Sequence, residues 1–194
     1  MIQFIPPNLP RVTEKRGVFF TGDEHYFHDN ILELQKDTRP FPDRKTMHST
    51  LIGNHNATIG KNGHVIHTGD FCFGKKEQFC EIVSQLNGTH YFIEGDHDDA
   101  LEDYYKWDDK PLELAKKVIF LPSLFHFTFD KVKISVCHYA MLRWKASHHN
   151  SRLAYAHSHG KLTYAGNAMD VGVDANGLHP ISIQTFLQKT NPHE

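Results

Sequence analysis

Val65-Ile66-His67-Thr68-Gly69-Asp70 is an apolar stretch that ends in a Gly-Asp pair, and the chain repeats this pattern twice. Val18-Phe19-Phe20-Thr21-Gly22-Asp23 continues to Glu24-His25, and Tyr91-Phe92-Ile93-Glu94-Gly95-Asp96 continues to His97-Asp98. Each stretch predicts a strand whose C-terminal end presents a carboxylate. Because ligands bind at the carboxyl ends of strands in open α/β sheets, we expect the three turns to meet at one site with Asp70 at its centre.

Length and composition predict a globular protein. A chain of 194 residues can bury an ample core, so we expect a single domain over residues 1–194, in which residues 1–16 form an extended N-terminal segment. The hydrophobic fraction is 39%, and the sequence contains neither an apolar run of about 18 residues nor a charged-then-apolar leader. These features predict a cytoplasmic protein without a membrane partner.

Charge and cysteine content narrow the functional classes. The formal net charge is −2 and no basic block is present, which argues against a large nucleic-acid footprint. Three cysteines, Cys72, Cys80 and Cys137, are too few and too scattered for a disulfide framework or a zinc knuckle. We expect them to be reduced and mostly buried. The oligomeric state is left open.

The first half of the chain alternates strands with helical patterns, which predicts parallel strands joined by crossover helices. Asp29 is placed to cap a short helix that runs to about Gln35. Longer helices are expected from Asp43 to about Thr58 and from Lys75 to Leu86. Residues 98–117 also have a helical pattern, which a proline interrupts.

The second half of the chain is rich in short strands. They are expected at Val118–Leu121, Leu124–Phe129, Val132–Cys137, Leu153–Ala156 and Met169–Val173. Asp130-Lys131 is expected to form a hairpin turn, and residues 181–188 fit either a strand or a helix. This order of elements predicts an α/β fold in which two mixed sheets face each other with helices outside.

Eight carboxylate and imidazole side chains follow predicted strand ends: Asp23, His25, Asp70, Asp96, His97, His138, His157 and His159. Aspartate and histidine together suit divalent transition metals, whereas calcium prefers ligand sets made only of oxygen. Eight candidates exceed the needs of one ion. A two-metal site, with a bridging carboxylate between ions about 3.5–4 Å apart, fits this number. Most of the other histidines are interpreted as surface or packing residues.

Five ordered blocks carry a resemblance to a known family: Gly22-Asp23-Glu24-His25, Gly69-Asp70, Gly95-Asp96-His97-Asp98, His138 and His157-Ser158-His159. In order and spacing they resemble the signature of the calcineurin-like metallophosphoesterases, over roughly residues 18–187. The resemblance is most specific to the small bacterial and phage members of the family. It is carried by Phe27-His28-Asp29-Asn30-Ile31, Arg39-Pro40-Phe41, Gly69-Asp70-Phe71 and Val171-Gly172-Val173-Asp174.

The resemblance implies a fold, a cofactor and a reaction. The fold would be a four-layer α/β/β/α sandwich with a dimetal site at the strand C-terminal ends. The two divalent transition metal ions would be manganese in the first instance, with iron, nickel, cobalt or zinc as alternatives. One ion would be held by Asp23, His25, Asp70 and His159, and the other by Asp70, Asp96, His138 and His157. The activity would be that of a hydrolase, a phosphodiesterase or phosphatase acting on phosphodiesters or small, nucleotide-like phosphomonoesters.

The resemblance also implies roles around the metals. A hydroxide that bridges the ions would attack phosphorus in line. His97 would protonate the leaving alkoxide as general acid, with Asp98 orienting its ring. Arg39, His28 and Arg143 are the candidates for contacting the phosphate or the leaving group, since arginine suits phosphate oxygens.

The sequence departs from the family pattern at two positions, and the departure at Asp96 keeps an alternative open, whereas the small side chain of Ala156 is tolerated. Asp96 stands where the family usually has asparagine, and Ala156 stands where glycine usually precedes the His-x-His pair. The extra carboxylate would lower the Lewis acidity of the ions and repel an anionic substrate. A catalytically weak scaffold that binds metal or nucleotide is therefore the alternative to an enzyme, and a protein with one structural metal is a third possibility.

Overall fold

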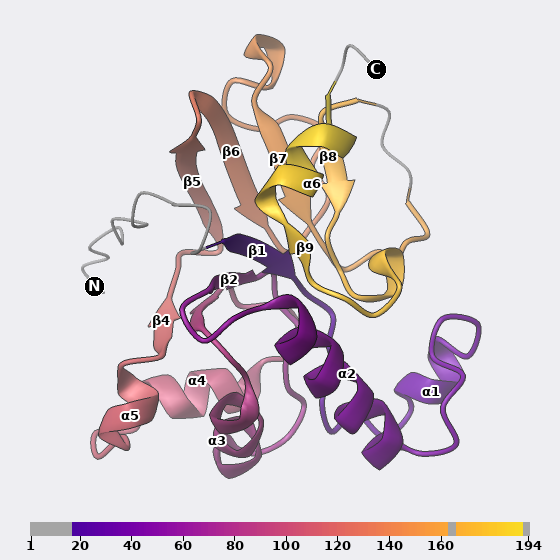
Figure 1. The fold of residues 1–194 in the computed structure, drawn as a ribbon, viewed down its shortest axis with the longest axis vertical. Helices are drawn as coiled ribbons and strands as arrows, with labels where there is room; N and C mark the ends of the chain where they lie inside the picture. The colour runs from indigo at the N-terminus through magenta and orange to yellow at the C-terminus, as the bar shows by residue number, and fades with distance from the viewer. Residues whose placement is uncertain (1–16, 163–165, 192–194) are drawn as a thin grey trace.

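A computed structural model describes residues 17–162 and 166–191 (Figure 1). The expected N-terminal segment, residues 1–16, lies outside this part of the chain. The first sheet has five strands: β1 (Val18–Thr21), β2 (His64–His67), β3 (Thr89–Phe92), β4 (Val118–Phe120) and β9 (Ile181–Ser182). The second sheet has four strands: β5 (Leu124–Phe129), β6 (Val132–Cys137), β7 (Arg152–Tyr155) and β8 (Ala168–Asp170).

The register of the first sheet aligns the three Gly-Asp turns. Its strand order is β4-β3-β2-β1-β9, with β1 to β4 parallel and β9 antiparallel to β1. Thr21 pairs with His67, and His67 pairs with Phe92, so β1, β2 and β3 end at the same level. The turns that follow these strands therefore start side by side at one edge, as the sequence predicted.

The second sheet is also mixed. Its order is β5-β6-β7-β8, in which β5 and β6 are antiparallel and the other pairs are parallel. Asp130 and Lys131 join β5 to β6 with φ values of 46° and 68°. Left-handed backbone at both central residues is the geometry of a two-residue hairpin turn that matches strand twist. The predicted hairpin and its turn are confirmed.

Helices cover the outer face of the first sheet, while the second sheet lies on its other side (Figure 1). The covering helices are α2 (Arg44–Thr58), α3 (Lys76–Gln85) and α4 (Asp99–Lys106). Their buried side chains, such as Met47, Phe79 and Leu101, join one apolar cluster with Phe71 and Phe92. A second cluster lies between the sheets. The coarse prediction of two facing mixed sheets with helices is therefore confirmed.

Local signals at the helix ends were partly right. The side chain of Asp43 accepts a hydrogen bond from the Thr46 backbone and caps α2. The expected cap at Asp29 is wrong, because α1 (Ile31–Leu34) begins after Asn30, which makes no side-chain cap bond. Residues 98–117 divide into α4 and α5 (Leu112–Ala115), which begins just after Pro111.

The C-terminal part and the outer face of the second sheet add detail. Residues 181–188 form β9 and then α6 (Ile183–Lys189), so both expected alternatives occur in succession.

On the outer face of the second sheet, Leu153, Tyr155 and Ala168 are packed by Ala140, Met141 and Trp144. These covering residues belong to the connection between β6 and β7, which includes the 3₁₀ helix η1 (Ser147–His149). In the described ranges this connection therefore packs on the outer face of the second sheet. The described helices include none long and apolar enough to span a membrane.

Candidate metal centre

Six of the predicted ligands gather into two groups at the strand C-terminal ends. Each residue offers one ligand atom, and within a group these atoms lie within 4.8 Å of one another. The first group is Asp23, His25 and His159, and the second is Asp70, His138 and His157. Each group combines residues that follow strands of the first sheet with residues that follow strands of the second sheet.

Asp70 connects the two groups. Its Oδ2 atom lies 3.6 Å from His25 Nε2 and 3.6 Å from His138 Nε2. His157 Nδ1 lies 3.2 Å from His138 Nε2. Ligand atoms that bind one ion at about 2.0–2.2 Å stand roughly 3–4 Å apart, so these separations suit shared ions. The predicted bridging position of Asp70 agrees with this geometry.

The backbone is strained where these side chains are presented. Five of the six residues have positive φ values: Asp23 (54°), His25 (53°), Asp70 (54°), His157 (66°) and His159 (48°). Left-handed backbone is uncommon outside glycine and carries an energetic cost of order 1 kcal/mol per residue. Such residues concentrate at functional sites, because the surrounding structure must hold them there.

Buried polar atoms at the centre lack partners among the described residues. Asp23 Oδ2 and both ring nitrogens of His25 are buried and make no hydrogen bond. Burying such atoms unpaired is costly, and a bound cation would satisfy them. Burial, followed by the nearby Arg39 charge, lowers the pKa of His25 to about 2, which keeps the ring neutral as a metal ligand requires. The donor set thus fits transition metal ions.

Hydrogen bonds orient two of the histidine rings. His138 Nδ1 is bonded to the Thr68 carbonyl at 2.9 Å, and His159 Nδ1 is bonded to Asp174 Oδ2 at 2.7 Å. His138 Nε2 lies 3.6 Å from Asp70 Oδ2, and Nε2 is the ring nitrogen of His159 that remains for an ion. A carboxylate or carbonyl behind a ligand histidine fixes its tautomer and raises its basicity.

Arg39 supports the candidate metal centre from the interior of the protein. The prediction that Arg39 contacts the substrate is wrong. The residue is 1% exposed. Its Nε and Nη2 atoms donate to the Asp174 carboxylate at 2.9 and 2.7 Å, and its guanidinium also donates to the carbonyls of Asp23 and Glu24. Burial alone would raise the pKa of Asp174, but hydrogen bonds from His159 and Arg39 outweigh it and hold that pKa well below its usual range.

Asp98 is predicted to orient the His97 ring, but in the described part of the chain its carboxylate braces the turns through backbone N–H groups. The carboxylate is buried and accepts hydrogen bonds at 2.8–3.2 Å from the backbone N–H groups of Asp70, Phe71, Cys72 and Gly95. It therefore ties the turn after β2 to the turn after β3. Burial raises the pKa of Asp98 to about 6.

Asp96 lies beside the second group. Its Oδ2 atom is 3.5 Å from His157 Nδ1, while its Oδ1 atom accepts a hydrogen bond from the Tyr139 hydroxyl. That hydrogen bond is the main reason why the pKa of Asp96 is lowered. Asp96 is exposed, whereas Asp70 is buried. We call the exposed side of the centre, which is formed by Asp96, His97, Tyr139 and His157, its mouth.

His97 also lies at the mouth and in neither ligand group. Its backbone N–H donates to Asp70 Oδ1 at 3.0 Å, while its exposed ring stands 4.4 Å from the Phe73 ring and 6.4 Å from the His25 ring. The His28 ring stacks on the same Phe73 ring, with 3.9 Å between the ring centroids. Arg143 is exposed in the connection after β6, and no hydrogen bond or ion pair joins it to either group within the described ranges.

Several supporting residues were not foreseen from the sequence. Asp174 stood in one of the blocks that resemble the phage-type enzymes, but its pairing with Arg39 had no local signal. Glu24, His67 and His90 form a buried chain, in which His67 Nδ1 lies 2.8 Å from Glu24 Oε1 and His67 Nε2 lies 2.9 Å from His90 Nδ1. His67 and His90 are marked in the sequence only as polar residues within otherwise apolar strands, and Glu24 only by its place in the Gly22-Asp23-Glu24-His25 block.

Comparison with known proteins supports the fold and leaves the function unassigned. No protein-family model matches the chain. An uncharacterized protein of Methanocaldococcus jannaschii, MJ1445, is 33% identical over 85 residues, which are 43% of this chain and 47% of that protein. The chain thus matches about half the length of this relative. A solved structure, the protein of unknown function AQ665 from Aquifex aeolicus, is 18% identical with a TM-score of 0.65, over 90% of this chain and 99% of that one. The chain shares its fold with AQ665.

Proposed function

We propose that this protein is a dinuclear metal-dependent phosphoesterase. The observation that carries the proposal is the pair of Asp/His groups joined by Asp70 Oδ2 at 3.6 Å from a histidine of each. Mixed carboxylate and imidazole ligands favour transition metals, and paired ions a few ångströms apart are typical of phosphatases and nucleases. The resemblance of the five sequence blocks to calcineurin-like metallophosphoesterases, with their four-layer sandwich, supports the same assignment.

The roles of the ligands follow from the two groups. Asp23, His25 and His159 would hold one ion, and His138 and His157 would hold the other with Asp96. Asp70 would be shared. When bound, two divalent ions lower the pKa of water and neutralise charge on the phosphoryl oxygens. Manganese is the ion we favour, with iron, nickel, cobalt and zinc as alternatives.

His97 is suited to protonate the leaving group. Its backbone is fixed to Asp70, while its ring is exposed at the mouth, within reach of a substrate placed on the ions. In this role it carries a proton on a ring nitrogen and gives it to the departing oxygen. Asp98 serves this step only by holding the turn, and Phe73 packs against the ring.

The open mouth suits small or flexible phosphoesters. His157, Asp96 and Tyr139 are all exposed there, and His28 lines the rim beside Phe73. Both phosphodiesters and small, nucleotide-like phosphomonoesters can approach such a centre. His28 remains our candidate for contacting the leaving group, whereas Arg39 supports the ligands from within.

The proposal is tested with metal-free protein that is reloaded with Mn²⁺, Ni²⁺ or Co²⁺. The substrates are an aryl monoester, an aryl diester, cyclic nucleotides and dinucleotides. We expect about two ions per chain and metal-dependent turnover of at least one ester. Asp70→Asn should abolish turnover, whereas Asp103→Asn, at an exposed position of α4, should not change it. Turnover that survives verified metal removal contradicts the proposal.

A metal- or nucleotide-binding scaffold is the second candidate. It is favoured by Asp96, whose carboxylate adds negative charge beside the second group where an anionic substrate would approach. A protein that holds about two ions, binds a nucleotide and hydrolyses none of the esters is this scaffold. About one ion per chain instead indicates a mononuclear or structural metal site.

A further inference from the structure

We infer that Tyr139 is a positioning residue that holds Asp96 as a ligand of the second metal ion. This rests on the metal-binding part of the proposed function. The Tyr139 hydroxyl donates a hydrogen bond to Asp96 Oδ1. The other carboxylate oxygen, Oδ2, faces His157 Nδ1 at 3.5 Å. Tyr139 therefore holds one carboxylate oxygen, and the other, which faces the second group, is positioned for an ion.

The Tyr139 ring also contacts the other histidine ligands of that group. Its centroid lies 4.9 Å from the His138 ring and 5.1 Å from the His157 ring, both in edge-on orientation. The backbone of Tyr139 is held in turn, because Cys137 Sγ donates to its carbonyl at 3.4 Å. One side chain thus touches three of the four candidate ligands of the second ion.

The phenol is needed because Asp96 is otherwise weakly held. The carboxylate is exposed at the mouth, where a side chain loses conformational freedom when it is fixed on an ion. A hydrogen bond from a neighbour orients a ligating carboxylate before the ion arrives, and removal of such partners typically lowers metal affinity by about 10–100-fold. No described contact links Tyr139 to Asp23, His25 or His159, so its effect should be confined to the second ion.

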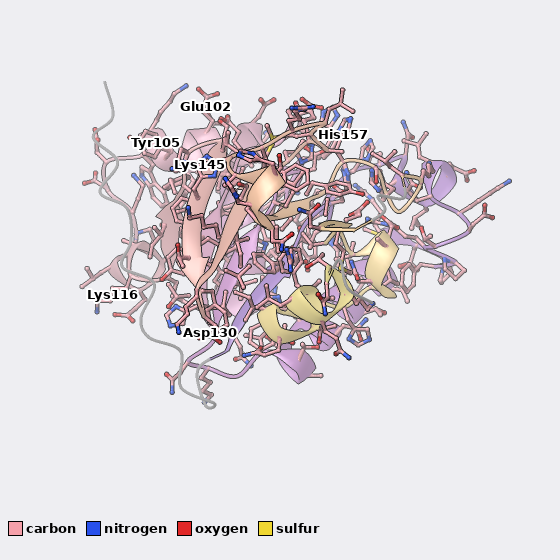
Figure 2. All side chains as sticks on the ribbon, turned by 90° about the horizontal axis from the view of Figure 1, so that it is seen from above. Glu102, Tyr105, Lys116, Asp130, Lys145 and His157 are labelled. Atoms are coloured by element: carbon pink, nitrogen blue, oxygen red, sulfur yellow. The ribbon has the colours of Figure 1, made fainter. Side chains whose placement is uncertain are left out.

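The test compares Tyr139→Phe with the native chain. Phenylalanine keeps the ring against both histidines and removes only the hydroxyl. Mn²⁺ is titrated calorimetrically into metal-free protein, and the visible spectrum of the Co²⁺ form reports ligand geometry. We expect the second ion to bind about 10–100-fold more weakly and the first to bind unchanged. Tyr105→Phe is the matched control, since Tyr105 lies on α4, apart from His157 (Figure 2).

A second background makes the inference falsifiable. In Asp96→Ala protein the hydroxyl has no carboxylate to hold, so Tyr139→Phe should cause no further loss of affinity. Equal weakening of both ions, unchanged binding of the second ion, or the same loss in the Asp96→Ala background would each overturn the inference. This experiment reads metal binding alone and does not depend on turnover. A protein that binds two ions in this way and hydrolyses no ester refutes the phosphoesterase and leaves the role of Tyr139 standing.

Discussion

Arg39 and Asp174 form a fully buried ion pair that is held by two hydrogen bonds, at 2.9 and 2.7 Å, and both side chains are 0% exposed. The same Asp174 oxygen that accepts from Nη2 also accepts from His159 Nδ1 at 2.7 Å. The orientation of a candidate ligand of the first ion therefore depends on an arginine far from it in the sequence.

Arg39→Met should leave Asp174 buried without its cation. Removal of one partner of a buried pair typically destabilises a protein by about 3–5 kcal/mol. We expect a loss of that size in the free energy of unfolding, measured with denaturant, together with weaker binding of the first ion. Arg44→Met removes an exposed ion pair with Asp29 and should change stability by less than about 1 kcal/mol. Equal effects of the two substitutions would contradict this account.

His97→Ala should reduce turnover by about 10²–10⁴-fold, the usual contribution of a general acid, while both ions stay bound. The reduction should shrink for esters with acidic leaving groups, which need little protonation. His149→Ala, at an exposed position of η1, is the control and should behave like the native chain. Metal analysis decides the assignment: loss of an ion from the His97→Ala protein would make the residue a ligand.

Asp96→Asn should accelerate turnover of the same ester by at least about tenfold, which corresponds to about 1.4 kcal/mol in the barrier. The substitution keeps a carbonyl oxygen for the ion and removes a negative charge from the mouth. Retention of metal should be similar or weaker. If the asparagine form is no faster, the charge of Asp96 does not restrain the reaction.

His48 should make stability depend on pH. Its Nε2 atom accepts a hydrogen bond from the Phe27 backbone, and burial together with the Arg44 charge lowers its pKa to about 4. Between the folded pKa of about 4 and the unfolded value near 6.5, the unfolded state binds the extra proton, so stability rises with pH. As the pH falls below about 6.5, protonation of His48 in the unfolded state progressively lowers the free energy of unfolding.

His48→Gln keeps an acceptor for Phe27 and cannot titrate. Unfolding followed by denaturant between pH 4 and 6.5 should therefore show a shallower slope for the variant than for the native chain. The comparison is made on metal-free protein at each pH, so that loss of metal does not contribute. Identical slopes would show that His48 is not held neutral by the fold.

Local patterns were sufficient for the elements that depend on burial and turns. Leu124–Phe129, Val132–Cys137 and the turn between them were predicted with their observed bounds, because alternation and turn chemistry are written into adjacent residues. The convergence of the Gly-Asp turns also follows from local order, since parallel strands end at one edge. The choice of Asp29 over Asn30 as a helix cap shows the limit of this reasoning: neighbouring residues with similar propensities are not separated by sequence alone.

The supporting roles needed contacts that no local pattern contains. The sequence suggests that Arg39 contacts phosphate, but its partner Asp174 lies 135 residues away. The sequence pairs Asp98 with its neighbour His97, whereas the Asp98 carboxylate accepts hydrogen bonds from backbone that lies up to 28 residues earlier. A free arginine or carboxylate near a motif looks the same in sequence whether it faces the substrate or the interior.

Each ligand group draws on both sheets, and this arrangement would make the ions cross-links between the two halves of the molecule. Asp23 and His25 follow a strand of the first sheet, while His159 follows a strand of the second. An ion that binds only the folded chain raises its stability in proportion to the logarithm of free metal. The supply of transition metal would then set how much of this protein survives proteolysis.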